Sequence, residues 1–130
     1  MKRLLLPVIC ALLLTASCKK DKETFNAEAT YSATAFTEKG CFDPGTVMSI
    51  NSLNAIEITF TNNTKNNLSF FWIDYSAEEK FYKELEPGQS WVCPTFLTHP
   101  WMVRKADNSC ATILIPKAGA AANETVTFEE

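Results

Sequence analysis

The segment AIEITFT at residues 55–61 alternates strictly between apolar and polar side chains. Its isoleucines and phenylalanine fall on one face and its glutamate and threonines on the other, which is the period of a half-buried β-strand. Beyond residue 17, no stretch of ten or more residues has the i, i+3, i+4 apolar pattern of a helix. These two observations predict an all-β fold.

Six residues that favour turns, NNTKNN at 62–67, separate this strand from the aromatic-rich run LSFFWIDY at 68–75. We expect a hairpin of the two strands. Further short strands are predicted at residues 80–83, 89–93, 101–105, 111–115 and 125–128, each bounded by turn-forming residues. Seven to eight short strands with turns every 8 to 12 residues are typical of a β-sandwich.

The chain has 130 residues, of which 46% are apolar, enough for one hydrophobic core and one domain. We expect this domain to occupy residues 41–130. Residues 25–35 alternate only weakly, so they fit either an edge strand or a linker. Residues 18–40 are therefore interpreted as a tether that includes this edge strand or linker.

The first seventeen residues have the composition of a signal peptide, with Lys2 and Arg3 before an apolar run at 4–14. This run is shorter than the roughly 20 residues that a membrane-spanning helix needs. Residues 14–18, LTASC, resemble the lipobox of bacterial lipoproteins, which implies cleavage before Cys18 and a lipid on its thiol. The charged run KKDKE at 19–23 suits a flexible tether. The alternative is an ordinary secretory signal in which the cysteine is incidental.

The resemblance to lipoproteins implies a location in the bacterial cell envelope, attached to a membrane through the lipid on Cys18. Because residue 19 is lysine and not aspartate, the sorting rules of such proteins imply the outer membrane, on its periplasmic or its surface side. Removal of residues 1–17 leaves ten basic and fifteen acidic residues, a net charge of about −5. Without clustered cations beyond the tether, nucleic acid is not expected as a partner.

Three cysteines remain for the folded part once Cys10 and Cys18 are assigned to the signal and the lipid. Cys41 and Cys110 each lie beside turn residues, whereas Cys93 ends a strand-like run. An oxidising compartment allows one bridge, so we predict a Cys41–Cys110 disulfide and a buried Cys93 thiol. The alternative is that no disulfide forms.

Residues 72–101, WIDYSAEEKFYKELEPGQSWVCPTFLTHPW, carry a set of spaced landmarks. The landmarks are WIDY at 72–75, Tyr82, Leu85 with Pro87-Gly88, Thr95-Phe96 and HPW at 99–101. Together they resemble the β domain of the von Hippel Lindau tumour suppressor family, including its stand-alone bacterial members. The similarity runs from about residue 49 to residue 116.

This resemblance implies a sandwich whose surface pocket binds 4-hydroxyproline in an extended peptide. The pocket positions of the family fall on Trp72, Tyr82, Thr95, His99 and Trp101. Thr95 stands where the tumour suppressor has serine, and it keeps the hydroxyl. Aromatic faces suit a pyrrolidine ring, while a hydroxyl and an imidazole can satisfy its 4-OH. The helical domain that recruits elongins and a cullin has no counterpart here, so no such partners are expected.

Two other functions fit the same residues. The five residues could stabilise a structural or assembly subunit of an envelope complex, in which case Tyr82, Thr95 and His99 would be buried. A hydrolase centred on His99 would need a nucleophile such as Cys93 or Thr95 and a carboxylate such as Asp74 near the imidazole. No nucleophile-elbow motif accompanies them, and a single histidine argues against a metal site. We therefore expect a binding module with no enzymatic activity and no cofactor.

Overall fold

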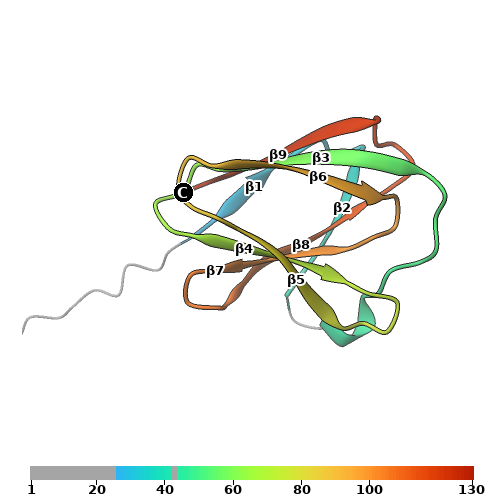
Figure 1. Cartoon of the computed structure of the whole chain (residues 1–130), viewed down its shortest axis with the longest axis horizontal. Coiled ribbons are helices and arrows are strands. Elements are labelled where there is room, and N and C mark those ends of the chain that lie inside the picture. The colour runs from blue at the N-terminus through green and yellow to red at the C-terminus, as the bar shows by residue number, and fades with distance from the viewer. Residues whose placement is uncertain (1–25, 42–43) are drawn as a thin grey trace, which may run out of the picture.

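The computed structural model describes residues 26–41 and 44–130, and strands form nearly all of the regular structure in this part (Figure 1). The strands are β1 (Glu28–Thr30), β2 (Phe36–Lys39), β3 (Ala55–Asn62), β4 (Leu68–Ile73), β5 (Glu79–Leu85), β6 (Ser90–Phe96), β7 (Trp101–Lys105), β8 (Cys110–Pro116) and β9 (Asn123–Glu129). One short 3₁₀ helix, η1 (Pro44–Thr46), precedes β3. The all-β prediction is confirmed, with nine strands in the described part and not seven or eight. The predicted signal peptide and Cys18 lie outside the described residues.

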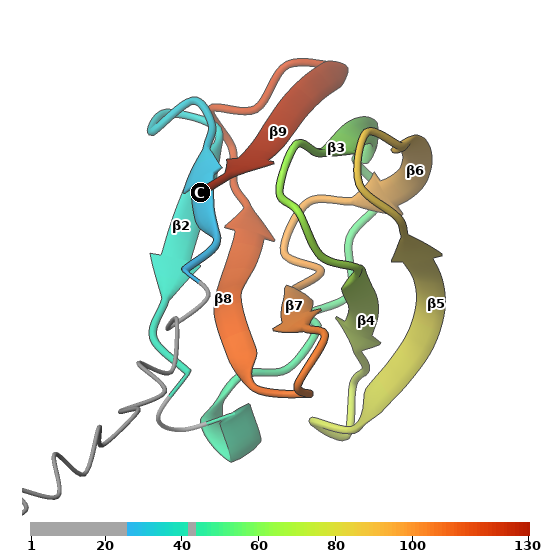
Figure 2. The ribbon, with the colours of Figure 1, turned by 90° about the vertical axis from the view of Figure 1, so that its left-hand side faces the viewer.

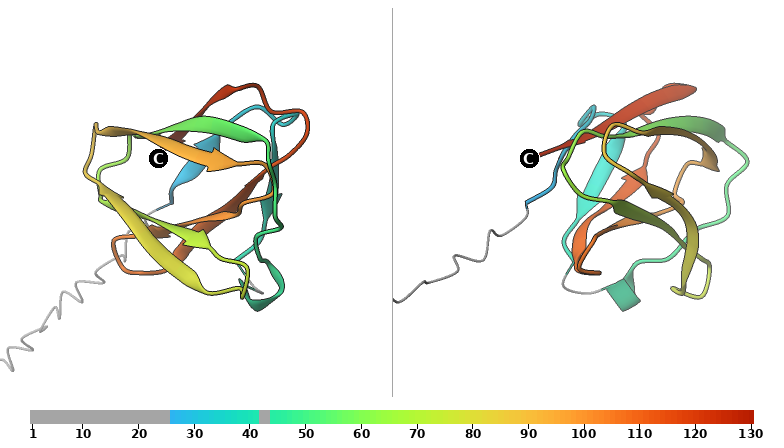
Figure 3. Two further views of the ribbon diagram at one scale, coloured as in Figure 1. Left: turned by 45° about the vertical axis from the view of Figure 1, so that its right-hand side comes forward. Right: turned by 60° about the vertical axis from the view of Figure 1, so that its left-hand side comes forward.

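The strands form two sheets that lie face to face (Figures 1 and 3). The first sheet, sheet A, has the strand order β1-β9-β3-β6. The second, sheet B, has the strand order β2-β8-β7-β4-β5, and Figure 2 shows these five strands next to each other. Both β1 and β2 lie within residues 18–40, the segment interpreted as a tether, and each supplies one edge strand of a sheet. The other two edges are β5 and β6. In the described part of the chain, no helix has the length and apolar character to cross a membrane.

The expected hairpin between residues 55–61 and 68–75 is wrong. β3 pairs with β6 and β9 in sheet A, whereas β4 pairs with β5 and β7 in sheet B. The two strands face each other across the core, where the rings of Phe60 and Phe70 lie 4.8 Å apart. The buried Asn62 side chain holds the connection by donating to the carbonyls of Asn66 and Leu85, at 2.8 and 2.9 Å. Alternation identified the buried faces correctly but could not identify the neighbouring strand.

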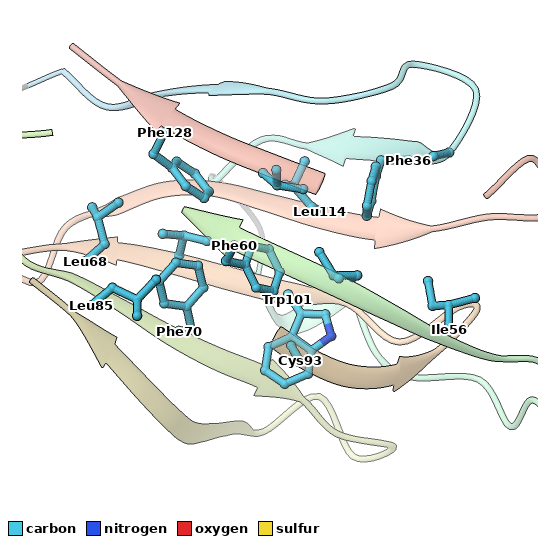
Figure 4. Packing of buried hydrophobic residues seen from close by; sticks show 14 residues of the cluster. Phe36, Ile56, Phe60, Leu68, Phe70, Leu85, Cys93, Trp101, Leu114 and Phe128 are labelled. Atoms are coloured by element: carbon cyan, nitrogen blue, oxygen red, sulfur yellow. The ribbon is translucent and has the colours of Figure 1, made fainter. Parts of the chain in front are cut away.

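The main core fills the space between the sheets (Figure 4). Its largest members are phenylalanines and branched residues that alternate along each strand, among them Ile58, Phe60, Phe70, Leu114 and Phe128. Trp101 also belongs to this cluster, with 2% of its surface exposed. Burial of a large apolar side chain contributes about 1.5 to 3 kcal/mol, so this cluster is the principal source of stability.

A second, smaller apolar cluster joins Val47 to the sheet B residues Ile73, Met102 and Ile113. Val47 directly follows η1, so the segment after η1 packs against sheet B. The Cys41–Cys110 disulfide connects the start of this region to the first residue of β8, with the Cα atoms 5.8 Å apart. The predicted pairing is therefore confirmed. Cys93 is a buried free thiol, as expected.

Candidate functional site

An aromatic pocket of about 210 Å³ lies at the open side of the sandwich, between the edge strands β5 and β6. All five residues that the family resemblance selected line it. The residues that line this aromatic pocket are Trp72, Tyr75, Tyr82, Pro94, Thr95, Phe96, His99 and Trp101. Residues up to 29 positions apart in the sequence thus converge on one cavity large enough for a single side chain.

Strand register brings the two tryptophans together. Trp72 on β4 and Trp101 on β7 are directly paired across an antiparallel ladder, so their side chains share one face. Tyr82 on β5 completes this aromatic wall, with its ring 5.1 Å from Trp101 and 6.3 Å from Trp72 in edge-on contacts. Ring separations of this kind favour a rigid surface. The wall is suited to packing against a small saturated ring.

Thr95 supplies the polar group at the base of the pocket. Its hydroxyl oxygen accepts a hydrogen bond from the indole Nε1–H of Trp101, 3.0 Å away. No described residue accepts a hydrogen bond from this hydroxyl. The Thr95 O–H can therefore donate to an oxygen atom placed in the pocket.

His99 lies in the connection between β6 and β7, with its imidazole 5.5 Å from the Trp72 ring. Its Nε2 is 3.2 Å from the hydroxyl oxygen of Tyr75, which fixes the orientation of the imidazole. No described residue forms a hydrogen bond with Nδ1, and this atom is not fully buried, so a ligand can reach it. Burial lowers the pKa of His99 below its usual value, so the imidazole is neutral near pH 7. A neutral imidazole can form a hydrogen bond with a ligand hydroxyl without carrying charge into the pocket.

The backbone just before His99 adopts a conformation that threonine rarely takes. Thr98 has a φ of 66°, which is strained for a β-branched residue. Two long-range hydrogen bonds hold it: the Thr98 N–H donates to the Pro116 carbonyl at 2.8 Å, and its hydroxyl donates to the Ile50 carbonyl at 2.7 Å. This strained turn places the imidazole over the pocket.

Sequence reasoning did not identify several residues that shape the pocket. Ser49 is buried, accepts the Trp72 indole N–H at 2.8 Å and donates to the Ile73 carbonyl at 2.6 Å, so it orients Trp72. Tyr75 belonged to a quoted landmark but received no role. Pro94 and Phe96 also line the pocket. Tyr75 and Phe96 carried a signal in the sequence, since both lie in quoted landmarks, whereas Ser49 acts on Trp72 from 23 residues away.

The three residues whose exposure distinguishes a binding pocket from a structural role differ in their solvent exposure. Tyr82 is 52% exposed, as a binding pocket requires, whereas Thr95 and His99 are 5% and 8% exposed. The two buried residues present only a small surface, and that surface faces the pocket. A structural role predicted that Tyr82, Thr95 and His99 would all be buried. Thr95 and His99 are buried and Tyr82 is not, although all three line one cavity.

The geometry differs from that of a hydrolase centred on His99. Among the described residues, the imidazole forms its hydrogen bond with Tyr75 and not with a carboxylate. The Asp74 carboxylate accepts the backbone N–H groups of Ser76 and Glu78. Burial raises the pKa of the Cys93 thiol to about 12, which disfavours a thiolate nucleophile. Within the described ranges, no three His, Cys, Asp or Glu side chains gather where they could hold a metal ion.

Comparison with known protein families identifies the family of this chain. A model of the VHL beta domain matches residues 47–117, which is more than half of the chain and includes every residue of the aromatic pocket. No curated protein matches the chain. The match agrees with the two-sheet architecture and with the landmarks at residues 72–101. The chain therefore belongs to the VHL beta domain family.

Proposed function

We propose that this protein is an envelope lipoprotein whose aromatic pocket binds an extended peptide through a proline or 4-hydroxyproline residue. VHL beta domains are, in general, substrate-recognition domains for hydroxyproline. The observation that carries the proposal is the convergence of Trp72, Tyr82, Thr95, His99 and Trp101 on one cavity. It is supported by the volume of about 210 Å³, which suits one small ring.

Two polar groups could read the ring hydroxyl. The Thr95 hydroxyl already accepts from Trp101, so its proton is available to a ligand oxygen, and His99 Nδ1 offers a second hydrogen-bonding atom. A ligand without the hydroxyl would leave these largely buried groups without a partner. Sites of this kind discriminate strongly against the ligand that lacks the polar group.

The free edge of β6 suits the backbone of an extended peptide. The Leu97 N–H donates to the Asn54 carbonyl and the Gln89 carbonyl accepts from Asn62, so odd-numbered residues bond toward β3. The backbone groups of Val92 and Pro94 and the N–H of Phe96 therefore point to the open edge, whereas the Phe96 carbonyl accepts the His99 N–H at 3.3 Å. Proline at position 94 removes one donor, which limits the registers in which another strand can pair. A bound peptide would continue sheet A beside the pocket.

The lipid anchor on Cys18 is compatible with access to the pocket. The described chain starts at the left of Figure 1, whereas the β6–β7 connection with His99 and the β4–β5 turn with Tyr75 lie at the right. A protein anchored through its N-terminal tether would present the pocket away from the membrane. This arrangement suits a receptor for peptides or protein segments in the envelope.

A structural or assembly role is the second candidate, favoured by the burial of Thr95 and His99. On this view the pocket residues stabilise the sandwich, and another envelope protein packs against its surface. The two functions differ in one measurable respect. Only the binding function predicts an affinity that depends on a ring hydroxyl in a free peptide.

Paired peptides that differ only in proline or 4-hydroxyproline test the proposed ligand. We expect the hydroxylated peptide to bind more tightly, and Thr95→Val to weaken its binding by about 1 to 3 kcal/mol because the donor is lost. The unmodified peptide should bind the variant and the wild type equally. Isothermal titration calorimetry gives both affinities. Equal affinity of the wild type for the two peptides would refute hydroxyl recognition, and no binding of either would favour the structural role.

The proposed anchor depends on the thiol of Cys18. We expect Cys18→Ser to release the protein from membranes or to leave it with its signal peptide attached, because cleavage and acylation both need the thiol. Detergent partitioning and globomycin-sensitive processing measure this change. The matched variant Cys10→Ser, within the signal peptide, should be processed as the wild type is. Unchanged processing and partitioning of Cys18→Ser would exclude a lipoprotein.

A further inference from the structure

A second hollow lies on the outer face of sheet A, adjacent to the aromatic pocket. This outer groove, of about 390 Å³, is lined chiefly by Ala55, Glu57, Pro94, Phe96, Ala122 and Asn123. Pro94, Thr95 and Phe96 line both cavities, so β6 forms a wall that the two hollows share. A ligand that lies along β6 would therefore pass both.

The outer groove is mainly apolar, and its polar lining residues are Thr95, Asn123 and one acid, Glu57. On β3, Glu57 pairs with Pro94 on one side and with Asn123 on the other, which places its exposed side chain in the middle of the groove. Among the described residues, no cation lines the groove, and none forms an ion pair with Glu57. The groove therefore combines apolar surface with a single uncompensated negative charge.

The geometry of a strand determines which ligand residue meets this groove. Side chains alternate between the two faces of a sheet. If one residue of a peptide paired with β6 points inward to the aromatic pocket, its neighbours point outward over Pro94 and Phe96. Strand spacing puts such a peptide roughly 10 Å from β3, which a long side chain can span toward Glu57.

We propose that the outer groove binds the side chain of a lysine or arginine next to the pocket-bound residue of the same peptide. Its methylene stem would pack on Pro94 and Phe96, and its cation would pair with Glu57. This inference rests on the proposed function, and it adds the class of the neighbouring residue. The acidic charge of the groove disfavours an anionic lipid surface or an acidic peptide segment as the occupant.

Peptides that carry hydroxyproline next to arginine, norleucine or glutamate test the proposal, with the variable residue placed on either side. For one of the two placements, we expect the arginine peptide to bind the wild type about two- to fivefold more tightly than the norleucine peptide. The glutamate peptide should bind least tightly. The preference for arginine should shrink as salt rises, because exposed charges are screened.

Glu57→Gln should abolish the preference for arginine and leave the affinity for the norleucine peptide unchanged. Glu129→Gln is the matched control, because it removes one exposed acid at the far end of β9 in the same sheet. This control should retain the preference. If both variants lose the preference, or if Glu57→Gln keeps it, the proposed role of the outer groove is wrong, even though peptides still bind. Failure of every peptide to bind would instead overturn the proposed function and the groove together.

Discussion

Removal of the Cys41–Cys110 disulfide should lower the free energy of unfolding by about 4 kcal/mol. The bridge joins residues 69 positions apart, so it restricts a long loop of the unfolded chain. It also ties the region before η1 to the start of β8, where the segment that carries Val47 packs against sheet B. The expected decrease in melting temperature is roughly 15 °C or more.

Thermal unfolding with and without reductant measures this effect, and the double variant Cys41→Ala/Cys110→Ala gives it without reductant. Cys93→Ala is the matched control, because it removes the remaining thiol of the sandwich and keeps the bridge. Reductant should lower the melting temperature of this control by as much as that of the wild type. An unchanged melting temperature in the double variant would mean that packing after η1 alone holds this region.

Loss of the disulfide should also alter the shape of the aromatic pocket. Ser49 follows Val47 by two residues and accepts the indole N–H of Trp72, while its own N–H donates to the Asp74 carbonyl. Loosening of this segment would release the ring of Trp72. Trp72 forms one wall of the pocket, so the stability of the bridge and the shape of the site are coupled.

The sequence predicts the strands well, because side-chain alternation reports burial directly. The segment 55–61 was predicted as a half-buried strand, and β3 spans Ala55–Asn62 with Ile56, Ile58 and Phe60 buried. The same signal does not report pairing. β3 and β4 follow each other closely in the chain, yet they belong to different sheets, because their large apolar faces meet across the core.

The pocket could be predicted only through the family resemblance. Trp101 is a core residue by its burial, and nothing in its local sequence distinguishes it from Trp91, which packs against the same core. Spacing of the landmarks supplied the five residues. Ser49 and the strained φ of Thr98 could not be predicted, because both depend on contacts with distant loops.

Truncation of Trp101 should cause the largest loss from a single substitution in the pocket. Its ring lies 6.2 Å from Phe60, 5.7 Å from Trp91 and 5.1 Å from Tyr82, and only 2% of its surface is exposed. Trp101→Ala therefore leaves a cavity in the main core and should cost about 3 to 5 kcal/mol of unfolding free energy. Urea denaturation measures it. A loss below about 1 kcal/mol would contradict the central position of this ring.

Two further variants separate the packing role of Trp101 from its hydrogen bond. Trp101→Phe keeps most of the aromatic packing but removes the N–H that Thr95 accepts, so it should reduce the preference for hydroxyproline over proline. Trp91→Ala is the matched control: it removes a neighbouring core tryptophan that does not line the pocket. It should destabilise the fold and leave that preference intact, measured by calorimetry at a temperature where the variants stay folded. If Trp91→Ala and Trp101→Phe reduce the preference equally, the indole N–H of Trp101 does not orient the Thr95 hydroxyl for recognition.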